Sequence, residues 1–215
     1  ERVSASRLGT FRECPRRFYH SYIRQRVPVA EPAALSFGRV FHSALEQWWL
    51  LGPEAAVRWL IEHAAEMDPV DAAKVGAMLG HYCPPIHLYD VIDTEREFVV
   101  PIINPETGRR MREYELLVRV DALVRRKSDG SLWLIEHKTT SEQVIGFGPY
   151  WQRLSIDHQV AFYLIATGAA GIAYDVCRKP ALRISKADEM LAAATRIGVA
   201  DAYQQRCSKE IEASP

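Results

Sequence analysis

The fold is decided by the stretch from Glu113 to Thr140, which reads EYELLVRVDALVRRKSDGSLWLIEHKTT. Val, Leu, Ile and Trp dominate both halves of this stretch, as in β-strands, and the SDGS sequence at 128–131 supplies the residues of a tight turn between them. A two-residue loop at the centre of that turn sets Asp121 on the first strand opposite Lys138 on the second. The stretch therefore predicts a hairpin that forms two central strands of a sheet.

The two faces of the predicted hairpin differ in character, because side chains alternate along a strand. One face is expected to be apolar and to belong to the core: Leu116, Val118, Val120, Ala122, Val124, Trp133 and Ile135. The other face gathers Asp121, Glu136 and Lys138 among three leucines. Two carboxylates and an ammonium in the middle of a sheet have two interpretations, a salt-bridged charge cluster or a functional site.

Length and composition are those of an ordinary soluble globular protein, with 215 residues of which 48% are hydrophobic and 25% charged. Lys plus Arg equal Asp plus Glu at 27 each, so the net charge does not indicate a polyanionic partner. A local cluster of arginines does indicate one: Arg7, Arg12, Arg16, Arg17, Arg24 and Arg26. Such a cluster either meets phosphates or forms a solvated helix face.

The four cysteines are scattered along the chain and form no CxxC pair: Cys14, Cys83, Cys177 and Cys207. The sequence shows neither a signal peptide nor an apolar run of transmembrane length. We therefore expect a reducing, cytoplasmic setting with free thiols, without secretion and without a membrane partner.

Helical patterns dominate the part of the chain that precedes the sheet. Ser36 is expected to cap the helix FGRVFHSALEQWWLLG, whose apolar positions recur at helical spacing. Gly38, His42 and Glu46 form a separate row beside the apolar stripe, each about one turn from the next. Two further helices are expected before the strands begin.

Strands and helices then follow in an order that defines the fold class. A strand is expected over 91–103, followed by the hairpin, and Ser155 is expected to cap a buried helix, IDHQVAFYLIAT. Gln159 and Tyr163 lie one turn apart on this helix, and a last strand is expected over 172–176. The order helix, three strands, helix, strand predicts an α/β fold with extra helices inserted before the sheet.

The acidic face of the hairpin suits a hard metal ion. Aspartate and glutamate oxygens without cysteine ligands nearby favour Mg²⁺ or Mn²⁺. Lys138 follows Glu136 by two residues and so points to the same side of the strand, where an ammonium can orient a water or steady charge on a phosphate. This combination is typical of phosphodiester hydrolysis.

Four blocks of the sequence together resemble a known family. VD at 120–121 followed by EHK at 136–138 resembles the signature of the PD-(D/E)XK nuclease superfamily, written here as D-x14-E-x-K, although Val replaces the proline. SRLGTFRECPRRFYHSYI at 6–23 resembles the opening helices of its RecB-type branch, which includes phage and CRISPR-adaptation nucleases. SFGRVFHSALEQW at 36–48 resembles that branch's G-x-x-x-H-x-x-L-E helix, and QVAFY at 159–163 its Q-x-x-x-Y motif.

The resemblance implies a restriction-endonuclease-like αβββαβ core with a mixed central sheet and additional N-terminal and inserted helices. It implies a single nuclease domain over 1–215. A mainly helical part over 1–90 carries His42, a sheet core over 91–180 carries the catalytic hairpin, and a C-terminal helix lies within 181–215.

The resemblance also assigns roles to single residues. Asp121 and Glu136 are implied metal ligands, and Lys138 is the implied catalytic lysine. The backbone carbonyl of His137 is implied as a third ligand, with its side chain pointing into the core. His42 is implied as a further ligand from the helix, whereas by itself it reads as a packing histidine.

Other residues receive implied roles that the sequence leaves open. Glu46 either holds a ligand in place or forms a helix salt bridge. Gln159 and Tyr163 orient the site, bind DNA, or pack in the core with a satisfied polar tip. Arg7, Arg12, Arg16 and Arg17 are expected to bind DNA. Whether Glu95 or Glu97 reaches the site from the neighbouring strand also stays open.

Some members of the RecB-type branch carry an iron–sulfur cluster on one early cysteine and a compact C-terminal trio. Cys14 matches the early position, but Cys177 and Cys207 lie thirty residues apart and lack a third partner. We therefore expect no iron–sulfur cluster in this chain.

The resemblance implies a Mg²⁺- or Mn²⁺-dependent deoxyribonuclease, bacterial or phage-encoded. We expect an exonuclease that acts on linear DNA ends or single strands in recombination, repair or phage DNA processing. The alternatives are a structure-specific or restriction-like endonuclease, and a catalytically silent subunit that binds nucleic acid or protein. The intact Asp121, Glu136 and Lys138 argue against the silent subunit.

Overall fold

The computed structural model describes residues 1–29, 33–195 and 198–213 of the chain. These residues form two compact units. The first unit comprises Glu1–Pro32, Leu88–Glu136 and Phe147–Ala173, and the second comprises Ala33–His87, His137–Gly146 and Tyr174–Pro215.

The first unit contains the N-terminal helices and most of the sheet. Its elements are β1 (Arg2–Val3), α1 (Ala5–Glu13), α2 (Pro15–Phe18), the π-helical turn η1 (Tyr19–Ile23), β2 (Tyr89–Ile103), β3 (Arg110–Arg126), α6 (Pro149–Ser155) and α7 (His158–Thr167). Two strands start in this unit and end in the second, namely β4 (Leu132–Thr140) and β5 (Gly171–Arg178).

The second unit is mainly helical. Its elements are α3 (Ala33–Leu51), α4 (Pro53–His63), the 3₁₀ turn η2 (Ala64–Glu66), α5 (Pro69–Gly80), α8 (Lys186–Thr195) and α9 (Val199–Glu212). A further 3₁₀ turn, η3 (Ile86–Leu88), leads from these helices to β2.

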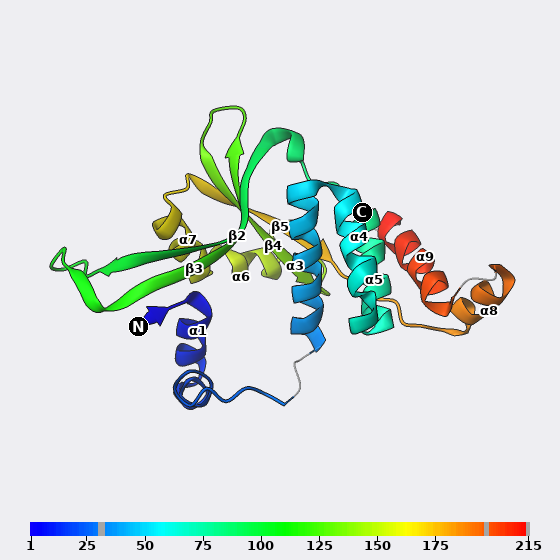
Figure 1. The fold of residues 1–215 in the computed structure, drawn as a ribbon, viewed down its shortest axis with the longest axis horizontal. Helices are drawn as coiled ribbons and strands as arrows, with labels where there is room; N and C mark the ends of the chain where they lie inside the picture. Colours follow the sequence, from blue (N-terminus) through cyan, green and yellow to red (C-terminus); the bar gives the residue numbers. More distant parts are fainter. Residues whose placement is uncertain (30–32, 196–197, 214–215) are drawn as a thin grey trace. The chain divides into compact units, whose positions relative to one another are not determined.

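Within the described residues the sheet has five strands and is organised around β3. β2 pairs antiparallel with β3 along its whole length, so β1 and β4 share the opposite edge, with β1 parallel and β4 antiparallel to β3 (Figure 1). β5 lies beside β4 and runs in the same direction, because Ala170 N–H donates to Leu132 C=O and Lys179 N–H to Thr140 C=O. This mixed sheet with helices between its strands confirms the predicted α/β, restriction-endonuclease-like class.

The β3–β4 hairpin exists, but its predicted register is wrong by two residues. Ala122 pairs with Ile135 and Arg125 with Leu132, so the loop is longer than the two residues expected. The physical reason is the Asp129 carboxylate, which accepts hydrogen bonds from the Ser131 amide at 3.1 Å and from Ser131 Oγ at 2.6 Å and so folds these residues into the turn. In this register the residue that follows Ile135, Glu136, comes nearer to the position of Asp121 than Lys138 does, so the predicted Asp121–Lys138 pairing is wrong.

A shift of two residues leaves each side chain on its predicted face, since the side-chain period of a strand is also two. Most of the expected core face is buried, since Leu116, Val118, Val120, Ala122, Val124 and Ile135 are each at most 5% exposed, whereas Trp133 is only half-buried. Burying side chains of this size stabilises the fold by about 1.5–3 kcal/mol each. The acidic face also carries buried apolar neighbours, Leu123 and Leu134, around its charges.

The helix that carries Gln159 and Tyr163 begins later than predicted. Ser155 ends α6, and Asp157 caps α7 by accepting the Gln159 amide hydrogen at 2.9 Å. The helix is also less buried than its apolar sequence suggests, because Tyr163 is buried but Ile165 is 70% exposed.

The helix α3 buries the apolar stripe predicted for it, with Phe37, Phe41, Ala44, Leu45 and Trp48 all buried. Its start is earlier than predicted, at Ala33, so Ser36 lies inside the helix and does not cap it.

The single C-terminal helix expected within 181–215 is in fact two helices, α8 and α9, and the second one packs on α5. Tyr203 and Cys207 of α9 pack in one buried cluster with Ala73 and Ala77 of α5.

Candidate active site

Three neighbouring strands of the first unit each place one carboxylate in the same row. Glu95 on β2 lies opposite Asp121 on β3, between the pairs Thr94–Ala122 and Arg96–Val120. One step beyond the Ala122–Ile135 pair, the β3–β4 ladder sets Glu136 on the other side of Asp121. Ligand oxygens of Glu95 and Asp121 lie within 4.8 Å of one another. The sheet thus gathers three carboxylates around the middle of β3.

Burial makes the charges of this row energetically costly. Glu136 is only 3% exposed, although it sits beside another carboxylate. An ionised carboxylate taken out of water costs several kcal/mol unless positive charge and hydrogen bonds compensate it. A divalent cation supplies that compensation, and oxygen donors are the ligands that Mg²⁺ and Mn²⁺ prefer. The donor set therefore fits such an ion.

Glu95 is the site residue that sequence reasoning left open, and the structure brings it beside Asp121. Glu95 lies between two register shifts of the β2–β3 ladder, one between Val91 and Asp93 and one between Pro101 and Ile103, which together set the register that puts it there. Its backbone has φ of +50°, a left-handed conformation that costs a residue with a side chain about 1–2 kcal/mol. Its carboxylate also forms an ion pair with Arg119 Nε at 2.7 Å. No local feature of the sequence predicts a register shift here, so the pairing of Glu95 with Asp121 was not predictable.

Tyr163 of α7 lies close enough to the carboxylate row to respond to its charges, and Gln159 is hydrogen-bonded to Tyr163. Burial raises the pKa of Tyr163, and the carboxylates of Glu136 and Asp121 raise it further. The phenol therefore keeps its proton at neutral pH, and it accepts a hydrogen bond from Gln159 Nε2. A phenol of this kind can donate its proton in a hydrogen bond to an acceptor in the site.

Two cavities of the first unit adjoin Gln159. One, of about 290 Å³, is lined by the start of α1, by Glu97 and Arg119, and by Gln159 and Tyr163. Glu97 therefore borders this cavity, whereas Glu95 joins the carboxylate row. The other, of about 350 Å³, lies between α1 and α7 and includes Arg17 in its lining.

Four further predicted site residues lie in the second unit, namely His42, Glu46, His137 and Lys138. His42 is half-buried on α3, and its ring meets the ring of His137 edge-on at a centroid distance of 6.0 Å. Glu46 is half-buried one turn further along α3. Lys138 is half-buried on β4, on the same side of the strand as Glu136.

The glycine of the predicted helix motif, Gly38, lies where α3 passes close to β4. A side chain there would meet the Thr139 hydroxyl at 3.9 Å, an ordinary contact distance, so space alone does not demand a glycine.

The arginines of the first helices differ in their surroundings. Arg7 donates to Arg2 C=O, pairs with Glu1, and lies over the rings of Phe18 and Tyr22 at 5.4 Å from each centroid. Arg7 thus holds the N-terminal helices together.

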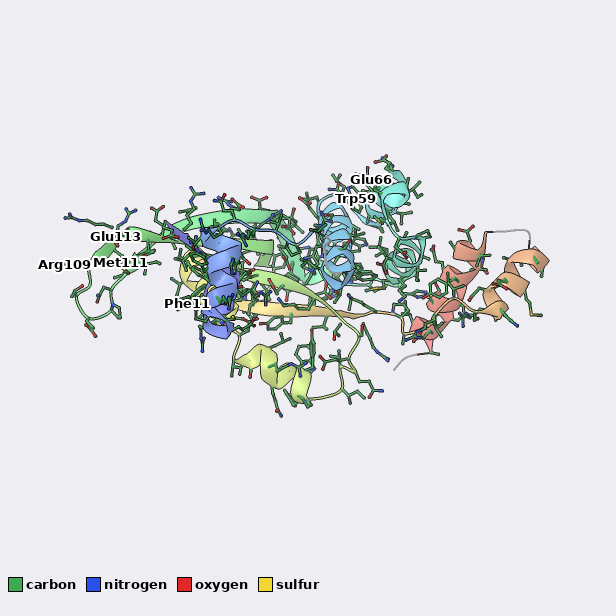
Figure 2. The ribbon with its side chains drawn as sticks, turned by 90° about the horizontal axis from the view of Figure 1, so that it is seen from below. Phe11, Trp59, Glu66, Arg109, Met111 and Glu113 are labelled. Carbon is green, nitrogen blue, oxygen red and sulfur yellow. The ribbon has the colours of Figure 1, made fainter. Side chains whose placement is uncertain are left out.

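Three arginines of these helices are exposed, namely Arg12, Arg16 and Arg17. Phe11 on α1 (Figure 2) is 49% exposed, although one side of its ring packs edge-on against Phe18 at 5.3 Å between centroids. The first helices therefore present both positive charge and aromatic surface to solvent.

The four cysteines, Cys14, Cys83, Cys177 and Cys207, are free thiols. Among the helices of the described part of the chain, none combines the length and the apolar character that a bilayer crossing requires.

Fold and site together describe an α/β protein whose sheet carries carboxylates of the kind that can hold a metal ion. The chain matches the family model of the PD-(D/E)XK nuclease superfamily over residues 2–210 and belongs to this superfamily. Its members are nucleases that depend on divalent metal ions.

Comparison with curated proteins finds none that matches. Among solved structures, the crystal structure of SSO0001 is similar at 20% sequence identity, with a TM-score of 0.35. The match covers 81% of this chain and 62% of that chain, so the present chain spans less than two thirds of its length.

Proposed function

We propose that the protein is a Mg²⁺- or Mn²⁺-dependent deoxyribonuclease, and more specifically an exonuclease of the RecB-type branch. The observation that carries this proposal is the row of Glu95, Asp121 and Glu136 on three adjacent strands, followed on β4 by Lys138. Three neighbouring carboxylates do not by themselves stabilise a fold, because like charges at adjacent positions destabilise a sheet.

Asp121, Glu136 and the backbone carbonyl of His137 would hold the cation, with Glu95 as an addition to the set that the resemblance implies. His42 remains a predicted ligand from α3. When bound, the cation would neutralise charge on the scissile phosphate and acidify the attacking water.

The protein's own side chains supply the remaining chemistry. The Lys138 ammonium would orient the attacking water and steady the negative charge that develops on the phosphate. The Tyr163 phenol, kept protonated by burial, would donate a hydrogen bond to a phosphate oxygen, and Gln159 would hold that phenol in place. Glu46, one turn beyond His42, would hold the ligands from α3 in place.

An exonuclease needs to grip a DNA end as well as cut it. The exposed Arg12, Arg16 and Arg17 would meet phosphates, and exposed aromatic rings such as Phe11 would stack on unpaired bases. The cavity beside Arg17 and Gln159 would lead the strand from these helices towards the carboxylates. A role in recombination, repair or phage DNA processing in the cytoplasm rests on the family resemblance.

The test uses purified protein with Mg²⁺ or Mn²⁺ on end-labelled linear DNA and on covalently closed circular DNA. We expect progressive loss of the linear substrate, an intact circle, and loss of activity in Asp121→Ala and Lys138→Ala. Lys127→Ala is the matched control, because Lys127 lies on the hairpin loop with an exposed partner, Asp90, at 3.4 Å.

Each other outcome overturns a stated part of the proposal. Efficient cutting of the circle identifies an endonuclease. Activity that survives both substitutions contradicts the site assignment. Tight DNA or protein binding without metal-dependent cutting identifies a silent binding subunit.

A further inference from the structure

The second unit contains a chain of hydrogen-bonded polar side chains that ends at the residue between Glu136 and Lys138. Trp49 Nε1–H donates to the Tyr82 hydroxyl at 2.8 Å, and that hydroxyl donates to Asp175 Oδ2. The same oxygen lies 2.9 Å from Nδ1 of His137. Three parts of the chain that are far apart in the sequence, α3, the segment just after α5 and β5, thus converge on His137 of β4.

The Asp175 carboxylate determines which atoms of Tyr82 and His137 carry protons. Burial raises the pKa of Tyr82, and the neighbouring Asp175 raises it further, so the phenol stays protonated and donates. Since a carboxylate can only accept, His137 must present Nδ1–H to Asp175. In the neutral ring, Nε2 then carries the lone pair, and the ring has one fixed orientation.

The ring of His137 is also held on its sides. Trp49 lies 5.8 Å from it between centroids, and His42 meets it edge-on at 6.0 Å. His137 itself is only 3% exposed. Any rotation of this ring would disturb His42 on α3 and the strand segment that carries Lys138.

We propose that Asp175, supported by Tyr82 and Trp49, is a positioning residue that orients His137 and through it His42 and Lys138. This inference rests on the proposed nuclease function and deepens it, because it adds a carboxylate–histidine pair behind the site. Simple core packing would need only an apolar side chain at position 137, and polar groups taken partly or wholly out of water are costly unless each of them has a partner.

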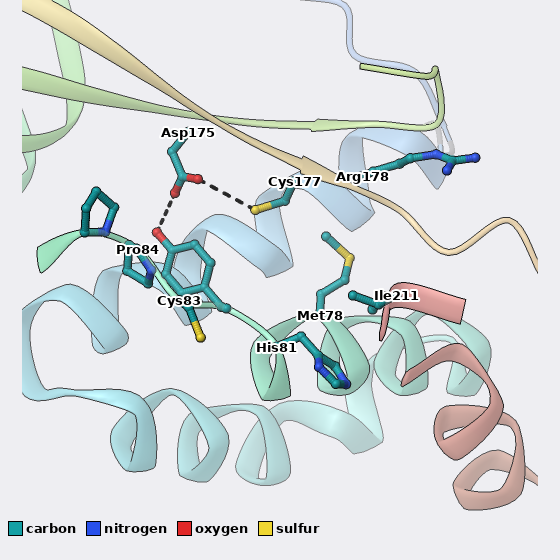
Figure 3. A pocket seen from close by; sticks show the side chains of 10 residues that line it. Met78, His81, Cys83, Pro84, Asp175, Cys177, Arg178 and Ile211 are labelled. Atoms are coloured by element: carbon teal, nitrogen blue, oxygen red, sulfur yellow. Dashed lines mark hydrogen bonds between the residues drawn. The ribbon is translucent and has the colours of Figure 1, made fainter. Parts of the chain in front are cut away.

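A cavity beside Asp175 makes it possible to test this role by chemical rescue. It has a volume of about 290 Å³, and Asp175, Cys177, Met78 and Ile211 are among the residues that line it (Figure 3). The Cys177 thiol donates weakly to Asp175 Oδ1 at 3.9 Å, so both carboxylate oxygens have neighbours on this side. Asp175→Ala would enlarge the cavity at the position of the carboxylate, and a small carboxylate from solution can enter there.

The experiment measures kcat and KM of Asp175→Ala with and without added acetate. We expect kcat to fall about 10–100-fold with little change in KM, as is usual when the partner of a site histidine is lost. Acetate should restore much of that loss in a concentration-dependent way, whereas acetamide, which has the same shape but no charge, should not. A residue that only stabilises the fold would not respond to acetate.

Asp188→Ala is the matched control, because Asp188 is also an aspartate of the second unit with a side-chain partner: it is buried and pairs with Arg206 at 2.6 Å. It should lose stability, keep its kcat well below its unfolding temperature, and show no response to acetate.

A second readout does not depend on metal or activity. In protein labelled with ¹⁵N-histidine, the His137 signals, assigned with His137→Gln, should show a protonated Nδ1 in the wild type and lose that pattern in Asp175→Ala. An unchanged pattern, or a wild-type kcat in Asp175→Ala, overturns the inference. A wild type that cuts no DNA but shows the protonated Nδ1 overturns the proposed function and leaves the placement of His137 confirmed.

Discussion

Asp121 stands between two other carboxylates because β3 lies between β2 and β4. Each strand alone would tolerate one acidic side chain, and the repulsion arises only when the ladder places them side by side. Glu95 adds a strained backbone, with φ of +50°, to the same place. We therefore expect the row to lower the stability of the metal-free protein if it forms the proposed cation site, as functional sites commonly do.

Asp121→Asn should raise the stability of the metal-free protein, because it removes a charge that has a like charge on either side. We expect a gain of about 1 kcal/mol in the free energy of unfolding, measured by thermal denaturation in the presence of EDTA. Nuclease activity should fall at least about a hundredfold, since a ligand is lost. Glu115→Gln is a control on the same strand, because Glu115 forms an ion pair with Arg110 at 2.7 Å away from the row. A metal-free protein that is destabilised by Asp121→Asn would contradict the repulsive row.

The hairpin turn sets the strand register that the sequence predicted wrongly. Its conformation depends on Gly130 as well as on Asp129. Gly130 has φ of +71° and has open space around it, so a side chain there would be strained without clashing. Gly130→Ala should therefore destabilise the protein by about 1 kcal/mol, a fall of about 2–4 °C in the unfolding temperature. Gly80 at the end of α5 also has open space but no positive φ. Equal effects of Gly130→Ala and Gly80→Ala would show that strain is not the cause.

The helices α1 and α2 carry the exposed arginines that are proposed to meet DNA phosphates. Arg12→Gln combined with Arg16→Gln should weaken DNA binding evenly across sequences and lower the slope of log K against log salt by about 2. Fluorescence anisotropy over a range of salt concentrations measures this slope. Arg58→Gln is the control, because Arg58 is an exposed arginine on a helix of the second unit. An unchanged slope in the double variant would exclude these two side chains from the DNA interface.

At the scale of the whole molecule, pH should act on stability through the C-terminal helices of the second unit. Asp188 on α8 is fully buried and pairs with Arg206 on α9 at 2.6 Å. Burial by itself raises the pKa of Asp188, but hydrogen bonds from Arg206 and from the Ser185 amide outweigh it and leave the pKa below its ordinary value. The folded state thus favours the charged carboxylate. Its stabilising effect is complete above about pH 4, the ordinary pKa of an aspartate, and is lost as the pH falls through the lower folded pKa.

Asp188→Asn should accordingly lower the free energy of unfolding by about 2 kcal/mol at pH 7, because charged hydrogen bonds are lost. The difference from the wild type should shrink below about pH 4, where the Asp188 carboxyl of the unfolded chain begins to be protonated while that of the folded chain still resists it. Thermal unfolding curves between pH 3 and pH 8 measure both effects. A difference that is the same at pH 3 and pH 7 would show that the charge of Asp188 does not contribute.

The sequence by itself determined the fold class, the buried face of the hairpin, the apolar stripe of α3, and the superfamily. These depend on periodicity and on motifs such as D-x14-E-x-K, which are local properties of the chain. The register error moved no side chain to the other face of the sheet, because side chains alternate with a period of two and the shift is two residues.

Only the tertiary structure decided what depends on neighbours from distant parts of the chain. The register shifts of the β2–β3 ladder bring Glu95 to Asp121, the side-chain hydrogen bonds of Asp129 set the hairpin register, and Asp157 rather than Ser155 caps α7. Asp175 reaches His137 from a strand 38 residues further on. A single sequence predicts which face a residue occupies but not which residue it meets there, because pairing energies across strands are small and a turn or bulge can shift the register at little cost.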